Sequence, residues 1–149
     1  MEHGLLAAEL FVNGYNCAQA IAVAFCDVTG LKKDDAAKMA SSFGGGMGRM
    51  REVCGAVSGM LLVAGILYGY DTPGDDVQKK AHYERVQELA GAFRRQVGSI
   101  VCREILKNPP TDPNPSPRTQ EYYQTRPCAR MVYTAAEILD AYICAHPLN

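Results

Sequence analysis

The sequence predicts an all-α fold, a single-domain bundle of about six helices over residues 1–149. Apolar residues recur at helical spacing through most of the chain, and no stretch alternates apolar and polar residues as a strand would. Glycines, prolines and capping residues separate the periodic stretches. A chain of 149 residues buries enough surface to fold without disulfides.

The first part of the chain predicts three helices. An amphipathic stretch over residues 5–11 ends at Gly14. Asn16 is a good N-cap for a second helix over residues 17–27. A third helix opens at two aspartates and runs over residues 34–43. We expect the leucines of the first helix to face the core.

The central helix is predicted over residues 53–70, which carry no charged side chain. This length is borderline for a membrane span. Its four glycines dilute the hydropathy, so we expect a buried helix of a bundle and no membrane span. Gly55 and Gly59 stand four apart, a spacing that lets a neighbouring backbone or a cofactor come close.

The second part of the chain predicts the longest helix, which starts at Asp75 or Asp76 and has an inner stripe from Val77 to Val97. Ser99 is expected to cap a short helix over residues 100–106. Residues 108–127 form a proline-rich loop, because so many prolines exclude a helix interior or a central strand. The last helix begins at Cys128.

Charge and composition exclude some classes of function. The formal net charge is −1, which argues against nucleic-acid binding, since that function shows a basic face. The chain opens without a basic segment followed by a long apolar one, so no secretory signal is evident. We therefore expect a cytoplasmic protein, in which cysteines serve metal binding or catalysis more often than disulfides.

Four of the six cysteines occupy predicted helix starts that lie far apart in sequence. The free N–H groups and the dipole at a helix start stabilise a thiolate over a thiol. Four thiols with this bias point to electron transfer, thiol redox chemistry or metal binding. Cys26 and Cys144 fall outside this pattern and are expected to be core residues. The four are Cys17, Cys54, Cys102 and Cys128.

Cationic residues lie close to these four cysteines in sequence. Each of five arginines stands within five residues of one of them, and a cationic neighbour lowers a thiol pKa. The same arginines can offset the charge of a thiolate-ligated cluster, or can be ordinary surface residues. His82 is expected on a solvated helix face, and His3 and His146 near mobile termini. The arginines are Arg49, Arg51, Arg103, Arg126 and Arg130.

The spacing of the cysteines leaves three chemistries open. No Cys-x-x-Cys occurs, which argues against a thioredoxin-like site and a zinc ribbon. Ligands from separate helices can still converge at one end of a bundle. Four thiolates suit an iron–sulfur cluster or a tetrahedral zinc ion, and pairs of them can instead form reversible disulfides.

A run of glycines, Gly44, Gly45 and Gly46 followed by Met47-Gly48, precedes the apolar helix. It lacks the Gly-Lys-Ser/Thr of a phosphate loop and the preceding strand of a dinucleotide site. We expect it to allow a close, backbone-only approach to a sulfur, a cluster or a partner backbone near Cys54.

These residues resemble a known family. Cys17, the run from Cys54-Gly55-Ala56 to Gly59, Cys102 and Cys128 are similar to the pattern of the C-GCAxxG-C-C family of redox-active proteins. The resemblance extends from Gly14 to about Met131. It implies a small, mostly helical bacterial protein with a redox role, in which an iron–sulfur cluster is a plausible occupant. It also implies association with transporters or oxidoreductases, and it brings no substrate or reaction.

Three hypotheses follow. The first is an electron-transfer or redox-sensing protein that holds a cluster or metal on Cys17, Cys54, Cys102 and Cys128. The second is a metal-free thiol–disulfide protein that uses the same cysteines. The third is a non-catalytic helical module that binds a transporter or a redox partner protein. A homodimer is expected only from the frequency of soluble oligomers.

Overall fold

The structure is a computed structural model that describes residues 2–149, and it confirms the all-α class. Within these residues all regular elements are helical, and one isolated bridge joins Val53 to Val101. Six helices have eight or more residues: α1 (His3–Val12), α2 (Cys17–Ala24), α4 (Lys33–Ala40), α6 (Gly55–Tyr68), α7 (Asp76–Val97) and α10 (Cys128–Ala145). The shorter elements are α3 (Cys26–Thr29), η1 (Ser41–Phe43), α5 (Gly44–Met47), α8 (Cys102–Ile105) and α9 (Gln120–Thr125).

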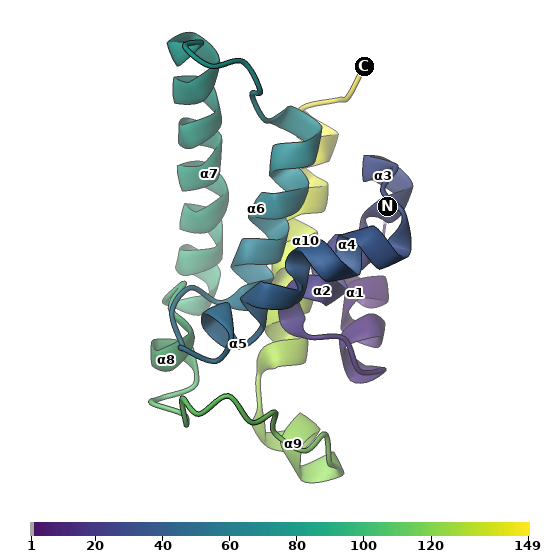
Figure 1. The fold of residues 1–149 in the computed structure, drawn as a ribbon, viewed down its shortest axis with the longest axis vertical. Helices are drawn as coiled ribbons and strands as arrows, with labels where there is room; N and C mark the ends of the chain where they lie inside the picture. The colour runs from purple at the N-terminus through teal and green to yellow at the C-terminus, as the bar shows by residue number, and fades with distance from the viewer. Residues whose placement is uncertain (1) are drawn as a thin grey trace.

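Helix α6 occupies the centre of the bundle, as its apolar sequence predicts. It packs against α2, α7 and α10, while α1 packs along α10 and α4 along α2 (Figure 1). The glycines of α6 let α2 come close, because a Cβ atom on Gly59 would stand 2.7 Å from the carbonyl oxygen of Ala18. The largest fully buried side chains are Phe25, Phe93, Ile21, Met60, Leu89, Leu139, Val57 and Val132.

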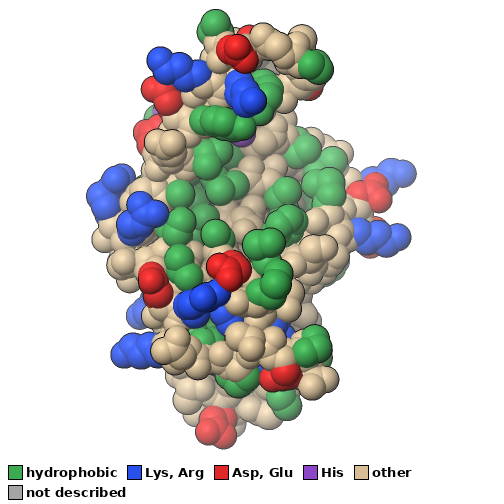
Figure 2. All heavy atoms as spheres, turned by 60° about the vertical axis from the view of Figure 1, so that its left-hand side comes forward, with side chains coloured by type: hydrophobic (Ala, Val, Ile, Leu, Met, Phe, Trp, Pro, Cys, Tyr) green, Lys and Arg blue, Asp and Glu red, His purple; other side chains and the backbone are tan. Residues whose placement is uncertain are grey.

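Two predicted apolar stripes are only partly buried. In α7 Leu89 and Phe93 are buried, but Val77 is 77% exposed because the first turns of the helix extend beyond the bundle. In α1 Phe11 is buried, whereas Leu5 is 62% exposed. Figure 2 shows the face of the molecule that carries α7, where apolar side chains gather between charged ones. No helix within residues 2–149 has both the length and the apolar character needed to cross a membrane.

The local signals at α2 act as predicted, with one break. Asn16 accepts a hydrogen bond from the Gln19 backbone N–H, and the Gln19 side chain accepts one from the Asn16 N–H, which makes a capping box. The predicted helix over residues 17–27 is interrupted at Phe25, whose ring is fully buried. Cys26 therefore begins the separate turn α3.

His3 joins the first helix to the last, contrary to the mobile terminus that was expected. Its side chain is buried, with Nδ1 2.6 Å from a carboxylate oxygen of Asp140 and Nε2 2.8 Å from one of Asp27. The imidazole also stacks on Phe25 at 4.0 Å between ring centroids. A protonated imidazole donates from both nitrogens, so this ring can satisfy both carboxylates.

The second part of the chain departs from prediction in two short segments. Residues 100–101 are not helical, Val101 is extended, and α8 starts at Cys102, because Val101 pairs with Val53. Residues 120–125 of the proline-rich loop form α9, whose N-cap Thr119 accepts a hydrogen bond from the Tyr122 N–H. That stretch contains no proline, so only the flanking parts of residues 108–127 are irregular.

Candidate functional site

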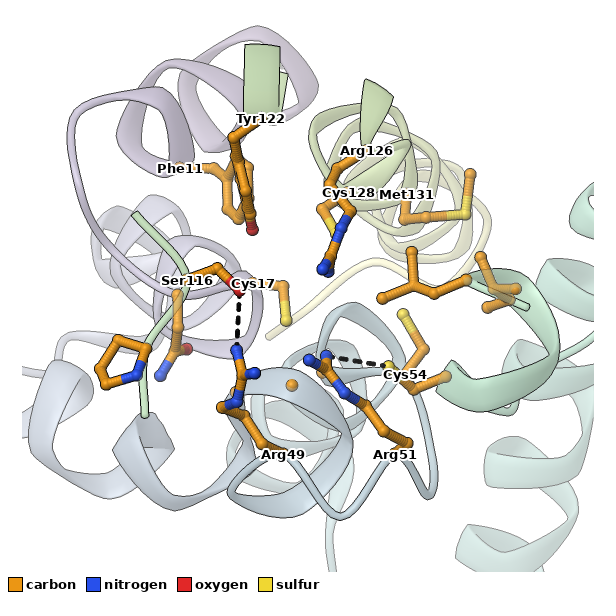
Figure 3. Close-up of a pocket in the computed structure, with 18 of the residues that line it drawn as sticks. Phe11, Cys17, Arg49, Arg51, Cys54, Ser116, Tyr122, Arg126, Cys128 and Met131 are labelled. Atoms are coloured by element: carbon orange, nitrogen blue, oxygen red, sulfur yellow. Dashed lines mark hydrogen bonds between the residues drawn. The ribbon is translucent and has the colours of Figure 1, made fainter. Parts of the chain in front are cut away.

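One cavity lies where the first residues of four helices meet (Figure 3). Its volume is about 230 Å³. Cys17 is the first residue of α2, Cys54 is the N-cap of α6, Cys102 is the first residue of α8, and Cys128 is the first residue of α10. The predicted helix starts are therefore confirmed, and all four cysteines line this single cavity.

The isolated bridge brings two of these cysteines together. The Cys54 N–H donates to the Ile100 carbonyl at 2.7 Å, and the Cys102 N–H donates to the Glu52 carbonyl at 2.6 Å. These bonds flank the Val53–Val101 pair and fix the starts of α6 and α8 side by side. The pairing joins segments about fifty residues apart, so local sequence patterns gave no sign of it.

Glycines allow the remaining close approaches. A Cβ atom on Gly55 would stand 2.3 Å from the Cys17 sulfur, and one on Gly46 would stand 2.7 Å from the Cys102 Cβ. Gly44, Gly45 and Gly55 line the cavity itself, whereas Gly46 and Gly59 pack behind it. A larger residue at Gly55 would therefore displace Cys17 or α2.

The glycine run forms a left-handed turn and not an ordinary helix. Residues 45–49 all have φ between +60° and +70°, and Arg51 follows with φ +63°. The Arg51 N–H donates to the Gly45 carbonyl at 3.2 Å, and the Glu52 N–H donates to the Gly46 carbonyl at 2.9 Å. A non-glycine residue pays roughly 1–2 kcal/mol for this conformation, so the strained residues in this turn merit a functional explanation.

The strained turn directs Arg51 into the protein. The Arg51 side chain is 3% exposed, and its Nε donates to the Pro110 carbonyl at 2.9 Å. Its Nη1 lies 3.8 Å from the Cys102 sulfur, within the range of a weak hydrogen bond. Its Nη2 is buried and has no hydrogen-bond partner within residues 2–149.

Arginines also fix the proline-rich loop as one wall of the cavity. Arg49 donates from Nε to the Asp112 carbonyl at 2.7 Å and from Nη1 to the Ser116 hydroxyl at 2.9 Å. Arg118 donates to the carbonyls of Phe11 and Tyr15. Arginine side chains that cross between the loop and other segments, in both directions, thus hold the loop in place.

Four arginines line the cavity, and the described residues lining it include no aspartate or glutamate. Three of them, Arg49, Arg51 and Arg126, were among the five singled out by sequence. Arg118 was missed, because its nearest predicted cysteine is ten residues away. Arg103 and Arg130 are exposed and do not line the cavity; Arg103 pairs with Glu52.

Burial changes the expected charge of the thiols. Desolvation raises the pKa of Cys17 and Cys54, although helix-start N–H groups and the Gly45 amide act in the opposite direction. Burial and the neighbouring Cys17 raise the pKa of Cys128 to about 11, against the lowering effect of Arg126. These three cysteines are therefore neutral thiols at pH 7, contrary to the thiolates that helix starts alone predicted.

All six cysteines are free in the structure, so no disulfide closes the cavity. Within residues 2–149 no three histidine, cysteine, aspartate or glutamate side chains are arranged to hold a single metal ion. Cys26 and Cys144 were expected to be buried and are not: Cys26 is half-buried, and Cys144 is exposed near the end of α10. Neither residue lines the cavity.

Fold and site together define a class: an all-helical protein in which four free thiols from separate helix starts share one arginine-lined cavity. The model of the family described as "Putative redox-active protein (C_GCAxxG_C_C)" matches residues 15–142. The chain belongs to this family. No curated protein and no solved structure matches the chain.

Proposed function

We propose that the cavity is a redox centre built on Cys17, Cys54, Cys102 and Cys128, and that its working form holds an iron–sulfur cluster. One observation carries the proposal: four free thiols, drawn from four helix starts, line the same cavity. A set of four cysteines is the usual ligand set of such a cluster. When bound, the cluster supplies one-electron transfer.

The charge of the cavity supports a thiolate-ligated occupant. The described residues that line it include four arginines and no carboxylate, so the negative charge of metal-bound thiolates would be compensated there. A coordinating metal deprotonates a thiol outright, which removes the obstacle that burial places before Cys17, Cys54 and Cys128. A cluster fits this cavity because of the four cysteine ligands and the buried arginine nitrogen that has no partner among the described residues. Within residues 2–149 no side chains are already arranged to hold a single metal ion.

The surrounding residues would tune this centre. Arg51 Nη1 faces the Cys102 sulfur, and the Gly45 amide acts on the Cys17 sulfur. Hydrogen bonds and positive charge at ligand sulfurs stabilise the more negative, reduced state and so raise a reduction potential. Phe11 and Met131 border the same space and limit the access of water.

A metal-free thiol–disulfide protein is the second candidate. The observation in its favour is that the described side chains do not gather into a single-ion site, although all four thiols share the cavity. Exchange needs a thiolate, and the raised pKa values of three of these thiols make it slow at pH 7. We therefore place this candidate after the cluster.

Anaerobic purification separates the two candidates. We expect brown protein with bound iron and acid-labile sulfide, both lost in Cys54→Ser. The matched control is the double variant Cys26→Ser/Cys144→Ser, which alters the two cysteines outside the cavity and should keep both. Colourless protein with a dithiothreitol-sensitive disulfide among the four cysteines would favour the second candidate. Equal iron in wild type and in a variant with all four cysteines replaced by serine would refute the cluster.

A further inference from the structure

One nitrogen of the buried Arg51 guanidinium has no partner among the described residues. Its Nη2 is buried without a hydrogen bond there, while Nε and Nη1 are occupied by Pro110 and Cys102. Burying a charged donor without a hydrogen-bond partner costs free energy, and native proteins rarely contain such a donor. The group lines the cavity and points into it (Figure 3). The missing partner is therefore to be sought in the cavity.

A second guanidinium enters the same space. Arg126 directly precedes Pro127 and the start of α10, and its guanidinium lies over the Tyr122 ring, 5.4 Å from the ring centroid. Figure 3 shows its guanidinium directed into the cavity, toward the side that Arg51 occupies. Within residues 2–149 the ion pairs include none with Arg126, and no side chain there accepts a hydrogen bond from it.

The other two arginines of the cavity are already engaged by the protein. Arg49 binds Asp112 and Ser116, and Arg118 binds backbone carbonyls. Among the described residues that line the cavity, no carboxylate balances Arg51 and Arg126. Two unneutralised, permanently charged groups that enter one cavity attract an anion.

We propose that Arg51 and Arg126 form a binding site for a small inorganic oxyanion of the phosphate and sulfate type. Guanidinium groups match the geometry of such oxygens and can donate two parallel hydrogen bonds to them. The volume of about 230 Å³ admits a small anion and not a nucleotide-sized one. The bound anion would lie beside the cysteines and accept a hydrogen bond from Arg51 Nη2.

This site shares the cavity of the proposed redox centre but does not depend on it. The oxyanion site requires only the guanidinium groups and a cavity lining that, among the described residues, includes no carboxylate. We therefore expect the anion to bind the reduced, metal-free protein. A cluster in the same cavity would compete with the anion for the same positive charge.

The test is isothermal titration calorimetry of reduced, metal-free full-length protein with sodium sulfate and with sodium phosphate. Sodium chloride keeps the ionic strength of all solutions equal. We expect saturable binding of one anion per chain. Arg51→Met and Arg126→Met should each weaken it by at least about tenfold, the value of one charge-assisted hydrogen bond. Arg130→Met is the matched control, because Arg130 lies next to the same helix start but is exposed and outside the cavity.

The outcomes are separable from those of the redox proposal. No saturable binding to either anion, or equal affinity in Arg126→Met and wild type, overturns the oxyanion site. Within residues 2–149 the Arg126 side chain makes no hydrogen bond, so Arg126→Met should fold even if Arg51→Met does not. Protein that assembles a cluster but binds no anion would support the redox centre and reject the oxyanion site. Protein that binds the anion but assembles no cluster would support the oxyanion site and reject the redox centre.

Discussion

Two buried basic side chains at different places in the bundle have opposite surroundings. His3 and Arg51 are both 3% exposed. His3 has a carboxylate at each ring nitrogen and an aromatic ring against its face. Within the part of the chain that the structure describes, Arg51 has a carbonyl and a sulfur as partners and one nitrogen without any, and no carboxylate lines its cavity.

The difference separates a structural basic side chain from a functional one. The His3 cluster is complete without a ligand and ties α1 and α3 to α10. The Arg51 site is incomplete within the described protein, and a strained left-handed turn holds it in place. A loss of folding stability to backbone strain and an unpaired buried charge is typical of binding and catalytic sites. The two sites should therefore respond differently when His3 and Arg51 are replaced.

The largest effect is expected at His3. His3→Ala leaves Asp140 and Asp27 without their shared partner and removes the stack on Phe25. We expect the free energy of unfolding to fall by about 3 kcal/mol, mainly through the lost packing of the buried ring and its lost bond to Asp140, because Asp27 is exposed and water can replace its partner. Urea denaturation measures it. His82→Ala is the control, since His82 is only half-buried and bonds to Arg85 within the same helix. An equal loss in both variants would contradict the structural role of His3.

A second effect concerns the thiols of the cavity and depends on pH. The pKa of Cys128 rises on folding from its ordinary value of 9.0 to about 11, mainly through burial. The folded state then binds more protons than the unfolded state between these values, so stability falls as pH rises from 9 to 11. For Cys128 the loss is about 2 kcal/mol.

Urea denaturation of reduced, metal-free protein between pH 8 and pH 11 measures this slope. Cys128→Ala should make it shallower, whereas Cys144→Ala, at an exposed site, should leave it unchanged. An unchanged slope in Cys128→Ala would mean that the cavity does not keep this thiol neutral.

The smallest effect on stability is expected at Arg51, and the contrast with His3 is greatest there. Arg51→Met removes a buried charge with an unpartnered nitrogen and replaces it with an apolar chain, at the loss of one bond to Pro110. These contributions oppose each other, so we expect the unfolding free energy to change by less than about 1 kcal/mol in either direction. Thermal denaturation in chloride buffer, beside His3→Ala, checks it. A loss as large as that of His3→Ala would show that Arg51 is a structural residue.

Much of the fold was predictable because its signals are local. Asn16 caps α2 through its own neighbour Gln19, Asp75 caps α7, and the apolar segment became the central helix. Where a local signal competed with a distant contact, the distant contact decided. Residues 100–101 pair with the segment before α6, and α2 ends where Phe25 enters the core.

The sequence by itself determined which cysteines begin helices, because capping residues, glycines and prolines act within a few positions. It also separated Cys17, Cys54, Cys102 and Cys128 from Cys26 and Cys144, although the latter two are not core residues. Only the tertiary structure decided that the four share one cavity, that burial keeps three of them neutral, and that Arg51 is buried while Arg103 is not. Desolvation and charge balance depend on which distant segments surround a side chain, and that information does not lie in the spacing of residues along the chain.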